Sequence, residues 1–240
     1  MRRPLLLLAS WALVSLLSGC AVLGAKRGVS EEDLSQTRRI GVVSLLGDRL
    51  YGVRIGTTVF QNDSFVAQVP EWKVDAYATD RAVALLKDRS SFEAAPLDRG
   101  ELVADRMPVD GWQQLKTAGA RQGFDRLVIV RPGTASTQDR GFFTPGYGLI
   151  ERSFFGLVRR CVYAAYIVDV MDVKTGEEIA WQWGSDFPCE YGKAPQLPIL
   201  ASFDQYSDVQ RESVRVGLMQ WIDKSMADAL GALKLIPAPR

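Results

Sequence analysis

The chain has 240 residues, of which 29 are Lys or Arg, 28 are Asp or Glu and none is His. This near-neutral balance argues against a nucleic-acid-binding protein, which needs a basic surface. The lack of histidine excludes Ser-His-Asp and Cys-His catalysis and any metal site built with imidazole. We therefore expect neither a cofactor nor an enzyme, unless catalysis uses carboxylates, Lys, Tyr or Ser.

The first 19 residues have the pattern of a secretory signal. Arg2 and Arg3 precede an apolar run over 5–17, which is too short to span a bilayer, since a spanning helix takes about 20 residues. The segment that follows, Leu17-Ser18-Gly19-Cys20, resembles the lipobox of bacterial lipoproteins, proteobacterial ones in particular. The resemblance implies cleavage before Cys20, a lipid on Cys20 and acylation of the new amino terminus by a chain such as palmitate.

The expected location follows from this lipid anchor. Several acyl chains hold a protein stably to a membrane, whereas one does so only marginally. Ala21 follows the cysteine, and in enteric-type bacteria a residue other than Asp at this place favours the outer over the inner membrane. We expect a protein on the periplasmic face of the outer membrane, with an envelope protein or the cell wall as its partner. Residues 20–37 are small and polar and predict a flexible tether.

Residues 38–235 are expected to form a single globular α/β domain, followed by a free tail, 236–240. Short β-rich runs bounded by Gly, Pro and Asp predict strands, and apolar stripes at helical spacing predict helices. Together they predict a mixed sheet of four to six strands with three helices. In chain order, the predicted strands are 39–46, 50–55 (as hairpin partner of the first), 57–70, 92–96, 124–131, 157–172 and 178–183, and the predicted helices are 74–87, 110–122 and 207–233.

The last helix has the strongest signals. Ser207 is a natural N-cap, and a stripe of apolar residues follows it at helical spacing. We expect this stripe to pack on the sheet. Its members are Val214, Leu218, Trp221, Ile222, Met226 and Leu230.

Two cysteines remain besides Cys20, and an oxidising compartment favours a disulfide between them. The loop 173–177 resembles a three-residue hairpin connection with Gly176 in the left-handed position. Such a hairpin pairs residues whose numbers sum to 350, as those of Cys161 and Cys189 do. We predict that these two form a disulfide; the alternative is two buried free thiols.

The order of the predicted elements is similar to that of two known modules. A long strand followed by Asp172-Val173-Lys174-Thr175-Gly176-Glu177 resembles the late hairpin of the curli-secretion lipoproteins and of the amino-terminal domain of the Tol translocation protein. The resemblance covers residues 38–235. It implies a periplasmic assembly or scaffold role without catalysis.

A long stretch over 133–156, rich in Gly and aromatic residues, is predicted to be irregular. Long loops of this kind are often functional, and aromatic side chains are favoured at interfaces. We take its aromatic residues as candidates for partner binding; the alternative is that they fold back onto the core. These residues are Phe142, Phe143, Tyr147, Phe154 and Phe155.

Two other functions stay open. A carboxylate-based hydrolase of envelope glycans needs two carboxyl groups about 5–10 Å apart in a cleft, and the spacing of the acidic residues selects no such pair. A carrier of a small ligand or lipid needs an apolar pocket. Asp169 lies within an apolar strand, where we expect a buried ion pair with an arginine.

Overall fold

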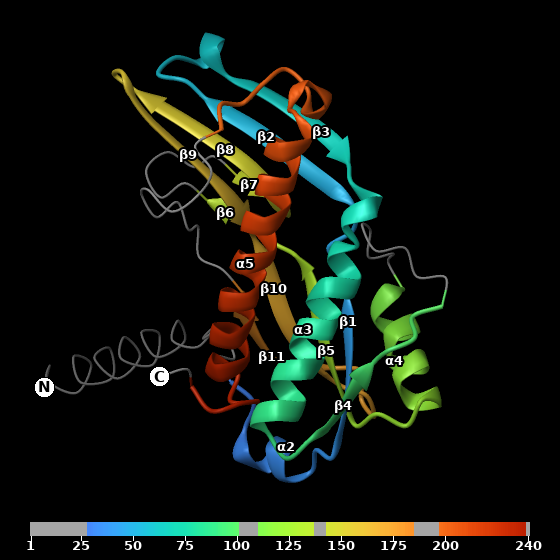
Figure 1. The fold of residues 1–240 in the computed structure, drawn as a ribbon. Coiled ribbons are helices and arrows are strands. Elements are labelled where there is room, and N and C mark those ends of the chain that lie inside the picture. Colours follow the sequence, from blue (N-terminus) through green and yellow to red (C-terminus); the bar gives the residue numbers. More distant parts are fainter. Residues whose placement is uncertain (1–27, 101–109, 137–142, 185–196, 239–240) are drawn as a thin grey trace, which may run out of the picture.

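The computed structural model describes residues 28–100, 110–136, 143–184 and 197–238. In this part the chain forms one α/β domain with two mixed sheets, a small two-stranded sheet and four α-helices (Figure 1). The predicted class is confirmed, but the strands divide between two sheets where one was expected.

The first sheet has the strand order β11-β10-β5-β1-β4. The three strands β5, β1 and β4 run parallel, and β10 and β11 extend the sheet antiparallel beside β5. The bounds are β1 Arg39–Ser44, β4 Glu93–Pro96, β5 Arg126–Pro132, β10 Tyr166–Asp172 and β11 Glu178–Trp183.

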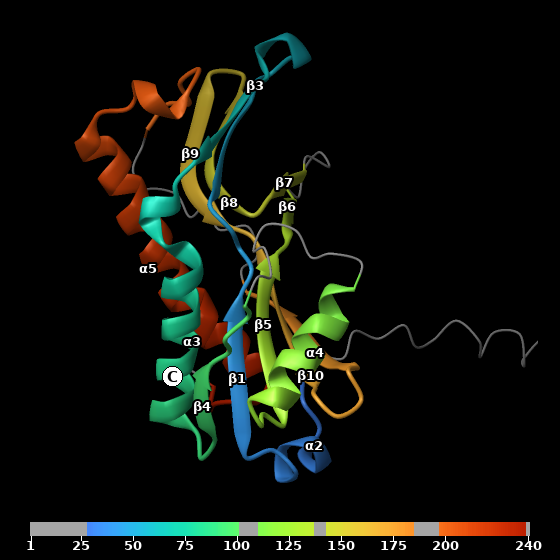
Figure 2. The same ribbon diagram turned by 90° about the vertical axis from the view of Figure 1, so that its right-hand side faces the viewer.

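Helices cover both faces of the first sheet, as parallel strands require. Helices α3 (Val74–Arg89) and α5 (Asp208–Ala232) lie on one face, and α4 (Gly111–Arg121) lies on the other (Figure 2). Neighbouring residues of one strand accordingly belong to two separate cores: Val128 packs with α3 and α5, and Ile129 packs with α4.

The second sheet has the order β3-β2-β8-β9. It consists of two hairpins, β2–β3 and β8–β9, joined by parallel pairing of β2 with β8. We expected residues 50–55 to pair with the first strand. They pair instead with β3 and β8. The bounds are β2 Arg49–Ile55, β3 Asp63–Gln68, β8 Tyr147–Phe154 and β9 Leu157–Ala164.

The stretch 133–156 is largely regular, so the prediction of an irregular loop is wrong. It contains β6 (Thr134–Ser136), β7 (Phe143–Pro145) and β8. One of its glycines, Gly148, marks a close approach of backbones: a Cβ on Gly148 would lie 1.8 Å from the carbonyl oxygen of Tyr51 on β2. Gly148 therefore reflects tight pairing of β2 with β8.

The predicted long strand 157–172 is two strands that belong to different sheets. The chain leaves the second sheet after β9 and enters the first at β10, with Ala165 between them. At this crossing the N–H of Ala165 donates to Gly146 O at 2.6 Å, and its carbonyl accepts from Gly133 N at 2.9 Å. Because Ala165 keeps both backbone partners, the strand changes sheets without leaving an unsatisfied buried group.

The β10–β11 hairpin has the predicted register over its outer part. Val168 pairs with Gln182 and Asp169 pairs with Trp181, so both pairs sum to 350. This register does not extend to Cys161, because Cys161 lies on β9 and pairs with Ile150 of β8 in the other sheet. Cys161 is buried, whereas Cys189 lies outside the described residues. The disulfide stays a prediction, now without support from the hairpin register.

The domain is longer at both ends than we expected. Val29 is only 1% exposed, and its N–H donates to Leu233 O at 3.0 Å. A short helix, α2 (Glu31–Ser35), follows. The predicted tether of 20–37 thus extends too far, because residues from 28 onward belong to the fold. Ile236 is also buried, so the free tail does not begin there.

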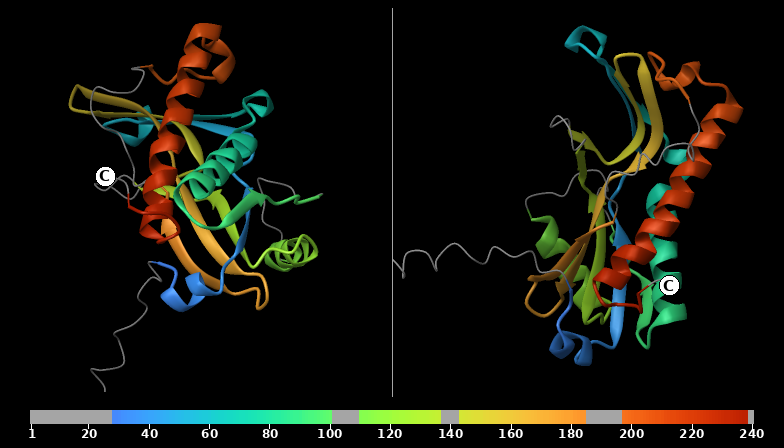
Figure 3. Two further views of the ribbon diagram at one scale, coloured as in Figure 1. Left: turned by 60° about the horizontal axis from the view of Figure 1, so that its bottom comes forward. Right: turned by 90° about the vertical axis from the view of Figure 1, so that its left-hand side faces the viewer.

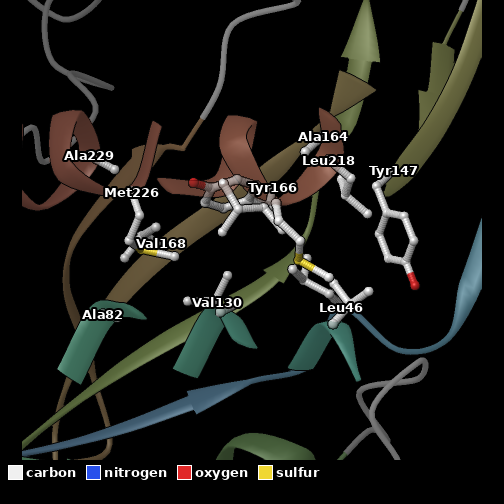
Figure 4. Packing of buried hydrophobic residues seen from close by; sticks show 14 of the residues in the cluster. Leu46, Ala82, Val130, Tyr147, Ala164, Tyr166, Val168, Leu218, Met226 and Ala229 are labelled. Carbon is white, nitrogen blue, oxygen red and sulfur yellow. The ribbon is translucent and has the colours of Figure 1, made fainter. Parts of the chain in front are cut away.

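Helix α5 joins the two sheets. It begins with a capping box in which Ser207 Oγ accepts from Gln210 N, and it contacts β11 of the first sheet and β8 and β9 of the second. Its 25 residues span about 37 Å at roughly 1.5 Å per residue, along the long direction of the domain (Figure 3). Figure 4 shows Met226 beside Val168 and Leu218 beside Tyr147, one contact with each sheet.

Candidate functional site: an apolar tip on two hairpins

The five aromatic candidates do not come together on one surface. Phe142 lies outside the described residues, Phe143 lies in β7 and Phe154 ends β8. Tyr147 is a core residue: it is 1% exposed, its hydroxyl donates to Gly47 O at 2.7 Å, and burial raises its pKa. Tyr147 is therefore unavailable to a partner, and its inclusion among the binding residues is wrong.

Of the two aromatic candidates whose side chains the structure describes, Tyr147 and Phe155, it is Phe155 that is presented to solvent. It lies in the turn between β8 and β9 and is 79% exposed. Its φ of 45° is left-handed, which is uncommon for a bulky residue. Gly156, with φ 83°, completes the turn. The turn thus holds an aromatic ring outward at some cost in backbone energy.

A second apolar turn connects β2 and β3. It is the 3-10 helix η2 (Val59–Gln61), in which Val59 is 72% and Phe60 is 95% exposed. This turn was not predicted from the sequence, because Val59 and Phe60 fitted a predicted strand over 57–70. The available signals were Gly56 before the turn and the capping pair Thr58 and Gln61 around it.

The two turns lie at the same end of the second sheet and contact each other (Figures 1 and 2). Strands β2 and β8 run parallel, with Ile55 opposite Arg152, so both hairpins make their turns at the same end of the sheet. The N–H of Phe155 donates to Thr57 Oγ1 at 3.3 Å. We call the exposed apolar residues at this end the apolar tip: Val59, Phe60, Phe155, Leu157 and Val158.

The N–H groups of five residues in the β2–β3 turn, 56–58, 61 and 62, are paired within the turn. Gln61 Oε1 accepts from Thr57 N at 2.9 Å and from Thr58 N at 3.4 Å. Asn62 Oδ1 accepts from Gly56 N at 2.9 Å, and Asn62 N donates to Val59 O at 3.2 Å. These hydrogen bonds fix the turn and reduce the number of backbone donors that need water.

The tip half of the two hairpins, residues 54–63 and 151–160, is basic. It contains the four arginines 54, 152, 159 and 160 and the two acidic residues 63 and 151, for a net charge of +2. Arg152 and Arg159 face each other across the β8–β9 pair. Their guanidinium groups therefore share the face of the sheet directly behind the apolar tip.

Glu151 fixes the opposite face of this sheet to the segment after 196. Its carboxylate accepts from Arg54 Nε at 3.1 Å, Arg160 Nε at 2.7 Å and Ile199 N at 3.1 Å. Arg54 also donates to Ile199 O. Although burial opposes ionisation, the hydrogen bonds from Arg160 and Ile199 lower the pKa of Glu151. With three donors bound, Glu151 acts as a structural anion.

Asp169 forms the buried ion pair that the sequence predicted. Arg131 donates to its two oxygens at 2.6 and 3.1 Å, and the residue is 0% exposed. Burial raises the pKa of Asp169 to about 6, against the effect of Arg131 and with a further rise from Glu178. Because no part of Asp169 reaches solvent, its carboxylate cannot contact a glycan substrate and does not support a hydrolase.

A second carboxylate, that of Asp75, lies where ligands often bind in α/β proteins, at the carboxyl ends of the parallel strands. Asp75 of α3 accepts from Ser44 Oγ at 2.8 Å, Leu46 N at 2.7 Å and Gly47 N at 3.2 Å through one oxygen. Its other oxygen accepts from Arg99 at 3.2 Å. Both oxygens of Asp75 are thus engaged, and they attach α3 to the end of β1.

The described residues contain no group of three or more Cys, Asp or Glu side chains that could hold a metal ion. Within the same part of the chain, no helix is long and apolar enough to cross a membrane. The apolar tip is the candidate functional site because Phe60 and Phe155 are exposed on two turns that are joined by a hydrogen bond. Neither models of known protein families nor curated proteins match this sequence.

Proposed function

We propose that this protein is a lipid-anchored lipoprotein of the cell envelope with a non-catalytic binding role. Its lipid, on Cys20, attaches it to the outer membrane, and its apolar tip is the surface that contacts a partner. The observation that carries the proposal is the exposure of Phe60 and Phe155, 95% and 79%, on two turns held together. Burying one such side chain is worth about 1.5–3 kcal/mol.

The position of the tip suits a protein that is attached to a membrane at one end and contacts its partner at the other. The chain enters the fold at Val29, where α5 ends, whereas the tip lies beyond the start of α5 (Figure 3). Residues 21–28 reach at most about 29 Å at ~3.6 Å each. A lipid on Cys20 therefore attaches one end of the domain to the membrane, and the tip forms the other end.

The lipid anchor has a direct test. Cells expressing the wild-type chain or Cys20→Ser are fed radioactive palmitate, and the protein is isolated. We expect label in the wild-type protein and none in the variant, together with loss of the variant from the membrane fraction. Label that persists in Cys20→Ser contradicts the anchor.

The tip is tested separately, in intact envelopes. A photo-crosslinking amino acid replaces Phe60 in one variant and Val209 in a control; Val209 is 80% exposed on α5, outside the tip. We expect a specific crosslinked product from position 60 and none from position 209. No product from position 60, or the same products from both positions, contradicts a binding role for the tip.

A further inference from the structure

We propose that the partner of the apolar tip is an anionic phospholipid bilayer, into which the tip inserts to the boundary between headgroups and acyl chains. This proposal rests on the proposed function, in which the tip is the contact surface. Three independent features of the tip support a bilayer over a protein.

The first feature is shape. The exposed apolar residues lie on and beside two turns at the end of the second sheet, and these turns project from the body of the domain (Figure 3). Phe60 keeps almost no contact with its own protein, and Leu157 is 73% exposed. A protein partner would have to provide a fitted pocket for each side chain. A bilayer accepts any projecting apolar group without such a fit.

The second feature is hydrogen bonding. Backbone groups without a partner are costly in the acyl region of a bilayer, where no water replaces them. In the tip, the N–H groups of Gly56, Thr57 and Asn62 are bonded within the turn, and that of Phe155 is bonded to Thr57 Oγ1. Within the turn, Asn62 Oδ1 accepts from Gly56 N, Gln61 Oε1 accepts from Thr57 N, and the main-chain oxygen of Val59 accepts from Asn62 N. The turns can therefore enter a medium of low polarity with these donors satisfied.

The third feature is the placement of charge. Arg159 lies two residues behind Leu157 on β9, which is about 7 Å at roughly 3.3 Å per residue. Interfacial segments bury their apolar side about 5–10 Å below the headgroups. With Leu157 and Phe155 at the acyl boundary, Arg159 and its neighbour Arg152 reach the level of the phosphates. Their positive charge favours anionic headgroups.

The consequence for the protein is a second membrane contact besides the lipid. The tip and the anchor lie at opposite ends of α5, so both engage one bilayer when α5 lies along its surface. The lipid would then hold the protein at the membrane, and the tip would fix the orientation of the domain.

The test uses the mature chain, residues 20–240, with Cys20→Ser so that no lipid contributes. Sedimentation with vesicles measures the bound fraction, with phosphatidylcholine alone or mixed with 30% phosphatidylglycerol. We expect binding to the anionic vesicles and weaker binding to the neutral ones. Phe60→Ser combined with Phe155→Ser should lower the partition coefficient at least tenfold, and the matched control Val209→Ser should leave it unchanged.

Two results overturn this proposal. One is no binding to either kind of vesicle, and the other is equal binding by the wild type and the double Phe→Ser variant. If the chain ignores vesicles while position 60 still crosslinks to a protein in envelopes, the bilayer is excluded and the binding role of the tip remains. If position 60 crosslinks to nothing in envelopes, the proposed function itself fails.

Discussion

The main-chain N–H of Phe155 donates to the hydroxyl of Thr57 at 3.3 Å, although the two residues are 98 positions apart in the sequence. This bond joins the turn of the β8–β9 hairpin to the turn of the β2–β3 hairpin. Phe60 and Phe155 therefore belong to one surface, although neither turn alone has a large apolar area. The candidate site exists only because β2 and β8 pair in parallel.

The exposed and the buried aromatic residues should respond oppositely to substitution. Phe60→Ser and Phe155→Ser should change the free energy of unfolding by less than about 0.5 kcal/mol, because both rings are exposed. Tyr147→Ala should lower it by about 3–5 kcal/mol, because it leaves a cavity beside α5 and an unpaired carbonyl at Gly47. Urea unfolding measures all three. A large loss in a tip variant would show that its ring packs in the fold.

Asp169 should make the stability depend on pH. Its pKa is about 6 in the folded protein and about 3.9 in an unfolded chain. The folded state therefore binds the proton of Asp169 more tightly than the unfolded state does. The resulting contribution to the free energy of unfolding is complete below about pH 4 and is lost as the pH rises through 6. The loss amounts to about 3 kcal/mol.

Asp169→Asn isolates this effect, because an amide does not titrate. The free energy of unfolding of the wild type minus that of Asp169→Asn should fall by about 2–3 kcal/mol between pH 4 and pH 7. Glu151 and the other titrating groups are present in both proteins and cancel. A difference that is constant over this range contradicts the raised pKa.

Glu151 should hold the segment after residue 196 to the second sheet. Glu151→Ala removes the acceptor for Arg54, Arg160 and Ile199 N and should cost about 2–4 kcal/mol of stability. Hydrogen exchange at the Ile199 amide should become faster. Glu212→Ala, which removes an exposed pair with Arg215 on α5, is the control and should leave that exchange rate unchanged.

Gly148 should tolerate no side chain. A Cβ at this position would lie 1.8 Å from the carbonyl oxygen of Tyr51, so Gly148→Ala must push β2 and β8 apart and should cost at least about 3 kcal/mol. Gly156→Ala meets no atom within 4 Å and pays only for its left-handed backbone, about 1–2 kcal/mol. Thermal unfolding of the two variants should show this order, and equal effects would contradict the close strand approach.

The predicted disulfide can be decided chemically. The free thiols of the purified protein are first blocked, and the protein is then digested without reductant. We expect a Cys161 peptide joined to a Cys189 peptide. Mass spectrometry identifies the joined pair and its disappearance after reduction. Recovery of both peptides in the blocked, unlinked form contradicts the disulfide.

The helices were predictable because their signals are local. Ser207 and Gly123 mark a helix start and a helix end through their own backbone preferences. The apolar periodicity between such marks fixes the buried face, and the buried positions Val214, Leu218 and Ile222 of α5 confirm it. The class of the fold followed from the order of these elements.

The division into two sheets was not predictable, because it depends on distant pairings. The run 157–172 is apolar on both faces, and no local signal marks Ala165 as the crossing point between sheets. The apolar tip was missed for a related reason. An apolar residue such as Phe60 in a β-rich run predicts a buried strand, and only the folded position of the turn shows that it is exposed.

The most direct test of the central claim, that the apolar tip is in contact with a partner in the cell, is protection of a cysteine placed there. Phe155→Cys and the control Val209→Cys are treated with a water-soluble maleimide, in intact envelopes and as purified protein. We predict that position 155 is labelled in the purified protein but protected in envelopes, whereas position 209 is labelled in both. Equal labelling of position 155 in both preparations would contradict the account.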